Sequence, residues 1–176
     1  MTPPGIRYRA ATPRDAMVIA ELVASASATY RDFAPPGWRP RLPTQEEPEI
    51  RMRLRRHDIR TRLALDPVSA AVGFTGWLPA SVRGEADERA LGRAHLWSLF
   101  VAPDWWGSGL AADLLKWSVD GMRDAGFTSA QLWTPVRNAR ARAFYEREGW
   151  KTGGQVTFSP ELGLDLVLYL IELGRD

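Results

Sequence analysis

Apolar and polar residues along this chain follow two periods, and together the periods predict strands and helices in a mixed order. The first predicted helix begins at Thr12, which can cap it, with proline at its first position and an acid in its first turn, and it ends near Ser27. A later helix over 110–125 carries an apolar face and is followed by Gly126, where a C-terminal cap belongs. The helix that begins at Asn138 has glycine at its end.

The elements that this pattern predicts follow the order β-α-α-β-β-β-α-β-α-β-β, without an internal repeat. They are a strand at 6–11, a helix at 12–27, an irregular proline-rich stretch at 34–48, a helix to about 57, strands at 62–65 and 70–78 around an Asp66-Pro67 turn, a surface loop at 81–93, a strand at 95–101, a helix at 110–125, a strand at 130–133, a helix at 138–149, and an antiparallel pair at 151–158 and 164–173.

The most informative stretch for function is the strand that runs into two closely spaced glycines, Gly107 and Gly109, at the start of the 110–125 helix. The first N–H groups of a helix have no partner inside it and lie at the positive end of its dipole, and glycine lets a phosphate approach without meeting a Cβ. The stretch therefore predicts a pocket for an anion such as a diphosphate. Alone it is weak evidence, because most Gly-Ser-Gly turns are only turns.

Three motifs in this order resemble the GCN5-related N-acetyltransferase (GNAT) superfamily. They are Leu99-Phe100-Val101-Ala102-Pro103, then Trp106-Gly107-Ser108-Gly109-Leu110-Ala111, then Asn138 with Ala141, Phe144, Tyr145 and Gly149-Trp150. The family's phosphate motif is Gln/Arg-x-x-Gly-x-Gly/Ala, and the second stretch matches it at Gly109 and Ala111. Trp106 stands where glutamine or arginine is usual, a change that backbone donors should survive. The motif-bearing match covers 93–157, and the order of elements extends it over nearly the whole chain.

The resemblance implies an α/β (α+β) GNAT fold with a mixed central sheet of about seven strands, splayed between the fourth and fifth and flanked by about four helices. A single N-acetyltransferase domain would span 1–176. The resemblance also implies acetyl-CoA as co-substrate, with its pantetheine arm lying in the gap like an added strand. The cofactor-binding residues it implies are Leu99, Phe100, Val101, Trp106, Gly107, Ser108, Gly109, Leu110, Ala111, Asn138 and Tyr145.

The implied reaction is the attack of an amine on a thioester. Amides of the pantetheine arm would pair with backbone groups of Leu99 and Val101, and a backbone N–H near Val101 would stabilise the oxyanion. An alkyl amine has a pKa near 10, so it arrives protonated and has to lose a proton before it attacks.

His95 is the predicted base and Tyr145 the predicted acid. Counting back from the phosphate motif places His95 where histone-acetylating members of the family carry their glutamate base. Burial would lower its pKa and favour the neutral form. If no bulge intervenes, alternation puts four residues of the strand on one face: His95, Trp97, Leu99 and Val101. Family members commonly place a tyrosine at position 145, near the thioester sulfur, where it can protonate the departing thiolate.

Each of these residues also has a purely structural interpretation. His95 could be a hydrogen-bonded strand histidine without a catalytic task, and Tyr145 shares helical spacing with Ala141 and Phe144, as a core residue would. Asn138 needs no function as a helix cap, yet the family's asparagine here also hydrogen-bonds the cofactor arm. Those two roles are compatible.

Composition bounds the class of protein. The chain has 176 residues, 45% of them hydrophobic, which suits one domain with a sizeable core. No apolar run approaches the roughly 20 residues of a membrane span, and the first residues start no signal peptide, so a cytoplasmic protein without membrane contact is expected. The absence of cysteine excludes disulfides, thiolate metal sites and an acyl-cysteine intermediate. Acyl transfer is therefore expected to be direct, and no metal is expected.

Charge argues only weakly about partners. The formal net charge is +2 and the pI is about 9.3, too mildly basic to indicate nucleic acid. Six arginines nevertheless lie between positions 51 and 62. Because Ile50, Leu54 and His57 leave an apolar stripe at helical spacing, the solvated face of a helix is favoured over a binding site for an acidic partner.

The acceptor is the least determined part of the site. The resemblance implies that four aromatic residues line its cleft, although tryptophan more commonly fills the core: Tyr30, Trp38, Trp77 and Trp133. Glu21, Glu46 and Glu47 could lie nearby. The acceptor can be a small-molecule amine or a peptide amine. The sequence also leaves open the length of the acyl group and whether the protein forms a homodimer. The expected function is acetyl-CoA-dependent N-acetyl transfer; the alternatives are a non-catalytic acyl-CoA-binding or regulatory module and a nucleic-acid-associated protein.

Overall fold

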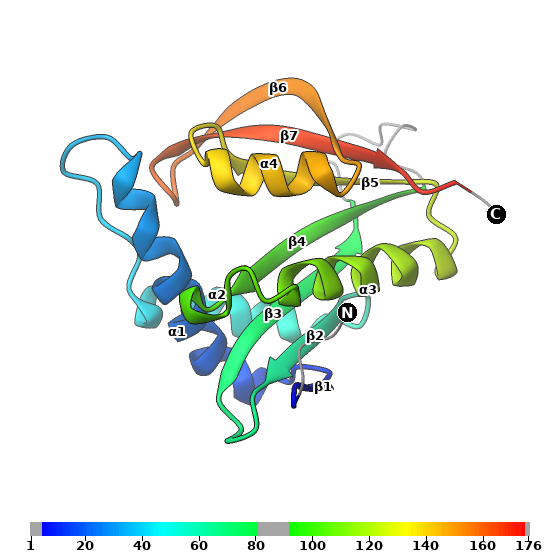
Figure 1. Cartoon of the computed structure of the whole chain (residues 1–176), viewed down its shortest axis with the longest axis horizontal. Helices are drawn as coiled ribbons and strands as arrows, with labels where there is room; N and C mark the ends of the chain where they lie inside the picture. Colours follow the sequence, from blue (N-terminus) through cyan, green and yellow to red (C-terminus); the bar gives the residue numbers. More distant parts are fainter. Residues whose placement is uncertain (1–4, 81–91, 175–176) are drawn as a thin grey trace.

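A computed structural model describes residues 5–80 and 92–174, and these form a seven-stranded sheet with the order β1-β2-β3-β4-β5-β7-β6 (Figure 1). The strands are β1 (Arg7–Arg9), β2 (Arg60–Leu65), β3 (Ala71–Pro79), β4 (Arg93–Val101), β5 (Ser129–Pro135), β6 (Lys151–Ser159) and β7 (Leu164–Glu172). The mixed seven-stranded sheet and the predicted order of elements are confirmed. Most of the loop predicted at 81–93 lies outside the described residues.

The sheet opens between β4 and β5. These two strands are parallel and pair only where Arg93–His95 faces Ser129–Gln131, at the start of each strand. Beyond that point β5 continues beside β7, with which it pairs along its whole length. Among the described residues, no strand pairs with the remaining part of β4 on its β5 side, which confirms the predicted splay.

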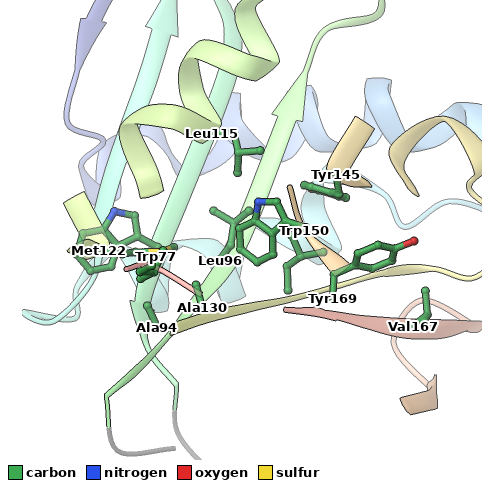
Figure 2. Packing of buried hydrophobic residues seen from close by; sticks show 12 residues of the cluster. Trp77, Ala94, Leu96, Leu115, Met122, Ala130, Tyr145, Trp150, Val167 and Tyr169 are labelled. Atoms are coloured by element: carbon green, nitrogen blue, oxygen red, sulfur yellow. The ribbon is translucent and has the colours of Figure 1, made fainter. Parts of the chain in front are cut away.

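Helices cover both faces of the sheet. We call the two faces the α1/α2 face and the α3/α4 face, after α1 (Ala16–Ser27), α2 (Pro43–Leu54), α3 (Leu110–Asp124) and α4 (Ala139–Arg147). On the α1/α2 face, Ile19 and Leu54 pack with Phe74 of β3 in one buried cluster. On the other face, Leu115 of α3 and Tyr145 of α4 share a larger cluster with β3, β4, β5 and β7 (Figure 2).

Glycines end the helices where the sequence predicts. Gly126 has φ +88°, which a residue with a Cβ rarely adopts. Its N–H donates to the Arg123 carbonyl oxygen, and the Phe127 N–H donates to that of Met122. Carbonyl groups at the end of α3 thus gain partners that the helix itself cannot supply.

The prediction for 34–48 was wrong at its end, because α2 already begins at Pro43. Proline is well tolerated at the first helical position, whereas Pro48 lies inside the helix and removes one backbone donor. The helix persists because Ile50 and Leu54 are buried against the sheet. Ion pairs one helical turn apart support its outer face: Arg51 with Glu47 and Arg53 with Glu49.

A β-bulge at Trp97 overturns the predicted alternation along β4. Gly76 of β3 faces Ser98, but the next residue of β3 faces Leu96, so Trp97 is an extra residue. Trp97 packs edge-on against Phe74, on the α1/α2 face. Val101 instead packs with Leu110 and Leu114 of α3. His95 and Trp97 therefore lie on the α1/α2 face, whereas Leu99 and Val101 lie on the opposite one.

Candidate active site

The turn between β4 and α3 is shaped to receive an anion. Gly107 has φ +78°, and Gly109, the N-cap of α3, has φ +89°. A Cβ built on Gly107 would meet no atom within 4 Å, so the backbone there is open. In the described part of the chain, the N–H groups of Gly107, Gly109 and Ala111 meet no acceptor. These donors fit a diphosphate, which needs several N–H groups directed at one place.

The Ser108 side chain hydrogen-bonds main-chain groups within the turn. Its hydroxyl donates to the Trp105 carbonyl oxygen at 2.6 Å and accepts the Leu110 N–H at 3.3 Å. The hydroxyl is thus used to fix the backbone, so that the anion pocket depends on main-chain donors.

The unpaired edge of β4 offers a second set of main-chain groups. The Ala102 N–H donates to the Val72 carbonyl oxygen of β3 at 2.9 Å. Main-chain groups of successive residues point to opposite sides of a strand, so those of Leu99 and Val101 point toward the gap beside β5. Their position fits an extended arm that adds to the sheet as a further strand would.

Trp106 already hydrogen-bonds one of these main-chain groups, the carbonyl of Val101. Its indole N–H donates to the Val101 carbonyl oxygen at 2.9 Å. The Arg140 guanidinium carbon of α4 lies 3.1 Å from the centre of a Trp106 ring, so the two side chains join the glycine turn to α4. The sequence predicted Trp106 both as an implied cofactor-binding residue and as a departure from the motif, without a hydrogen-bond partner. Arg140 was missed, because its position two residues after Asn138 does not reveal a partner in a distant turn.

Tyr145 lies in the apolar cluster beside the gap (Figure 2). The residue is 8% exposed, and its ring packs with Phe144, Trp150 and Tyr169. Burial is the main cause that raises the pKa of Tyr145, and nearby Tyr30 raises it further. The phenol therefore keeps its proton at neutral pH until a strong acceptor forms next to it.

Asn138 holds the start of α4 as predicted. Its side-chain oxygen accepts the Ala141 N–H at 3.1 Å, and the residue is buried. With the oxygen engaged, the side-chain N–H groups are left to bond the Tyr30 hydroxyl. Asn138 therefore connects the helix to a residue that the sequence placed in the acceptor wall.

His95 is half-buried on the α1/α2 face, across the sheet from Tyr145. Burial, followed by the positive charge of Arg53, lowers the pKa of His95 to about 4, which keeps the imidazole neutral. Its Nδ1 atom is buried and has no hydrogen-bond partner among residues 5–80 and 92–174. Arg53, which the sequence did not single out as a site residue, stacks on Trp97 with its guanidinium carbon 5.0 Å from a ring centre.

Only two of the four predicted acceptor residues are shown in contact. Tyr30 and Trp38 lie 6.2 Å apart between ring centres, and the Trp38 indole N–H donates to the Leu162 carbonyl oxygen before β7. Trp77 instead faces α3, buried beside Phe127 in the core. Trp133 is half-buried on the side of β5 opposite to the buried Leu132.

The arginines between 51 and 62 are largely engaged with neighbours. Arg56 pairs with Asp58 at 2.6 Å, and Arg51 and Arg53 pair within α2. Arg62 lies between the rings of Tyr8 and Trp117. This cluster is mostly the charged face of α2 and its continuation, the interpretation that the sequence favoured.

Two features are absent from the described residues: a cluster of metal-ligating side chains and a membrane-spanning helix. No group of three or more histidine, aspartate or glutamate side chains in residues 5–80 and 92–174 could hold a metal ion. No helix within these ranges is long and apolar enough to cross a membrane.

Sequence comparison identifies the family. Residues 25–150, well over half of the chain, match the acetyltransferase (GNAT) family. The chain therefore belongs to the GNAT acetyltransferase family. Among curated proteins, none is significantly similar in sequence.

Solved structures share the fold. A GNAT-family protein from Desulfovibrio desulfuricans is 22% identical with a TM-score of 0.70, over 96% of this chain and 99% of that one. The ribosomal-protein-S18-alanine N-acetyltransferase from Escherichia coli is 15% identical with a TM-score of 0.69, over 97% and 96% of the chains. The yncA protein from Salmonella typhimurium, solved with acetyl-CoA, is 17% identical with a TM-score of 0.68, over 97% and 95%. At these identities the likeness establishes the fold alone.

Proposed function

We propose that this protein is an acetyl-CoA-dependent N-acetyltransferase that passes the acetyl group directly to a primary amine. The observation that carries the proposal is the parting of β4 and β5 beside a glycine turn whose N–H groups lack acceptors in the described chain. One feature suits the extended arm of the coenzyme, and the other suits its diphosphate. The unpaired edge of β4 and the glycine turn that follows it together support coenzyme binding better than either feature alone.

Acetyl-CoA supplies an activated acetyl thioester when bound. The main chain of Gly107, Gly109 and Ala111 would hold its phosphates, and that of Leu99 and Val101 would hold its arm. A main-chain N–H near Val101 would stabilise negative charge on the acetyl oxygen as it develops. No cysteine is available to carry the acetyl group, which supports direct transfer.

Tyr145 is proposed to donate the proton that the leaving sulfur needs. Its raised pKa suits this role, because the phenol stays protonated until a more basic thiolate lies beside it. The surrounding rings exclude water from the side chain, which keeps the proton directed at one acceptor.

His95 is proposed to accept a proton from the amine after attack has begun. With a pKa of about 4, it is a far weaker base than an alkyl amine with a pKa near 10. Taking a proton from the free ammonium would cost roughly 8 kcal/mol at 1.36 kcal/mol per pKa unit. Once the nitrogen bonds to the carbonyl carbon its protons become more acidic, and a neutral imidazole can accept one.

A second candidate, an acyl-CoA-binding module without catalysis, is favoured by one specific observation. The Trp106 indole already occupies the Val101 carbonyl oxygen, which a pantetheine N–H would otherwise use. A protein of this kind would bind the coenzyme without releasing its thiol.

The deciding experiment measures binding and turnover separately. Acetyl-CoA is titrated by calorimetry and by thermal shift, and thiol release is then followed with a panel of peptide N-termini, lysine peptides, polyamines and small amines. Binding with amine-dependent release supports the enzyme, and binding without release across the panel supports the module. If acetyl-CoA gave no heat and no thermal shift, both candidate functions would be contradicted.

A further inference from the structure

Arg140 is the first arginine of α4, and its guanidinium lies on the side chain that precedes the glycine turn. The guanidinium carbon is 3.1 Å from the centre of a Trp106 ring. At so short a separation the guanidinium lies flat on the ring, because an N–H group directed into the ring would hold the carbon farther away. The stack uses the face of the guanidinium and leaves its N–H groups, which lie in its plane, to bond an acceptor.

These N–H groups have no protein acceptor in residues 5–80 and 92–174, where Arg140 makes no hydrogen bond and no ion pair. Its charge acts on Tyr30, but burial raises the pKa of Tyr30 to about 12, so that group stays a neutral phenol. The neighbouring arginines are all engaged with oxygen atoms of the protein: Arg137, Arg142 and Arg147. Arg140 is therefore an exposed cation, held in place by a ring, whose donors are left for a ligand.

The glycine turn has no cationic side chain of its own. No lysine or arginine occurs between Arg93 and Lys116, a span that contains the end of β4, the turn and the first residues of α3. Lys116 itself pairs with Asp120 at 2.6 Å, one helical turn further on. Main-chain N–H groups offer only partial positive charges, whereas a diphosphate carries full negative charges. A cation for the anion pocket therefore has to come from another element.

We propose that Arg140 is the cation of the coenzyme site and bonds the diphosphate that the glycine turn receives. This inference rests on the proposed function, because it requires the coenzyme to bind in the gap. Arginine suits the ligand, since the in-plane N–H groups of one guanidinium can bond two phosphate oxygens at once. Arg140 belongs to α4, which follows β5, and the turn follows β4. A coenzyme bonded to both would join the two sides of the gap.

Trp106 is proposed to position Arg140 for this contact. Its indole N–H donates to the Val101 carbonyl oxygen at 2.9 Å, which fixes the ring at the end of β4. A long arginine side chain loses conformational freedom when it binds a ligand, and stacking on a fixed ring removes part of that cost beforehand. The face of the Trp106 ring is therefore expected to assist binding through Arg140.

The test measures the Kd for coenzyme A by calorimetry in Arg140→Gln, which removes the charge and the planar donors. Loss of charged hydrogen bonds should raise this Kd by about 10- to 100-fold. Dephospho-coenzyme A keeps the diphosphate and lacks the 3′-phosphate, so its Kd should rise by the same factor. A rise that disappears with dephospho-coenzyme A would assign Arg140 to the 3′-phosphate and overturn the proposal, as would an unchanged Kd for coenzyme A.

Arg147→Gln is the matched control. It removes the same charge from the same helix, and its guanidinium also lies over an aromatic ring, 5.5 Å from the centre of Phe144. The Kd for coenzyme A should stay within about 2-fold of wild type, because Arg147 does not contact the turn side chain. Equal losses in Arg147→Gln and Arg140→Gln would mean that net charge acts from a distance, which would contradict the proposal.

Two variants of Trp106 separate the ring from the indole N–H. Trp106→Phe and Trp106→Leu both release the Val101 carbonyl oxygen, but only phenylalanine keeps a ring face for Arg140. Trp106→Leu should therefore bind coenzyme A about 3- to 10-fold more weakly than Trp106→Phe. Combined with Arg140→Gln, the two should bind equally. A difference that persists there would overturn the positioning role.

Arg140→Lys keeps the test decisive if Arg140→Gln does not fold. Lysine retains the charge without the planar donors, so the Kd for coenzyme A should rise less than in Arg140→Gln but measurably, by about 3-fold or more. A Kd equal to that of wild type in Arg140→Lys would contradict bonding through the guanidinium. Failure of the proposed function is read from the wild-type protein instead, which would then release no thiol with any amine.

Discussion

The two sides of the gap between β4 and β5 are built differently. On the side of the glycine turn, the groups offered to a ligand are main-chain N–H groups fixed by positive φ at Gly107 and Gly109. On the α1/α2 face, the notable groups are the side chains of His95 and Arg53, and a buried ring nitrogen of His95 has no partner in the part of the chain that the structure describes. If the proposed function holds, the main-chain groups would bind the coenzyme whatever side chains surround them, and the side chains would set the chemistry toward the acceptor.

A substitution that disturbs the main-chain donors of the glycine turn should have the largest effect on function. Gly109→Val places a branched side chain at φ +89° and disturbs at least two N–H donors to a charged group. At 1.5–3 kcal/mol for each such bond, affinity for acetyl-CoA should fall by about 100-fold or more, as measured by calorimetry.

Gly126→Val is the matched control for that change. Gly126 has nearly the same φ, +88°, at the other end of α3. It should lower the thermal midpoint through the same backbone strain but leave the Kd for acetyl-CoA unchanged. If both variants weakened binding equally, backbone strain would explain the loss, and not the removal of main-chain N–H donors from the glycine turn.

Removing the proposed acid should have the next largest effect. Tyr145→Phe keeps the packing with Trp150 and Tyr169 but cannot donate a proton. Steady-state kinetics should show kcat lower by about 10- to 100-fold with little change in the Kd for coenzyme A. An unchanged kcat would reject Tyr145 as the acid.

The role of His95 on the α1/α2 face should be visible in the pH dependence of kcat/KM. A histidine with a pKa of about 4 is neutral above that value, so if His95 is the base, kcat/KM calculated per unprotonated amine should fall on its acidic side only near pH 4. Arg53→Gln removes a positive charge that lowers this pKa, so the acidic limb should move to higher pH. Arg51→Gln, whose arginine pairs with Glu47, should leave the limb in place. A limb that persists in His95→Ala would dismiss His95.

The smallest effect is expected at Trp106. Trp106→Phe keeps a ring for Arg140 and releases the Val101 carbonyl oxygen. If the coenzyme arm uses that oxygen, affinity for acetyl-CoA should rise by about 2- to 10-fold, the equivalent of one neutral hydrogen bond. Trp105→Phe, one residue earlier, should leave the Kd as it is. A weaker Kd in Trp106→Phe would mean that the indole helps to hold the coenzyme.

Most of the backbone could be predicted because its signals are local. Gly126 and Gly149 mark the ends of their helices, and Asn138 caps α4, since each acts on groups within a few residues of itself. The prediction failed at Pro43, where tertiary burial of Ile50 and Leu54 sustains a helix despite an internal proline. Local signals carry no information about such distant support.

The sequence by itself determined the family motifs, the glycine turn and the order of strands and helices, because these follow from periodicity and from backbone conformations that only certain residues adopt. The tertiary structure decided where the side chains of the site lie. The bulge at Trp97 places His95 on the face opposite Val101, and Trp77 packs in the core beside Phe127. One extra residue in a strand reverses the direction of every side chain beyond it, and this depends on pairing with a neighbouring strand.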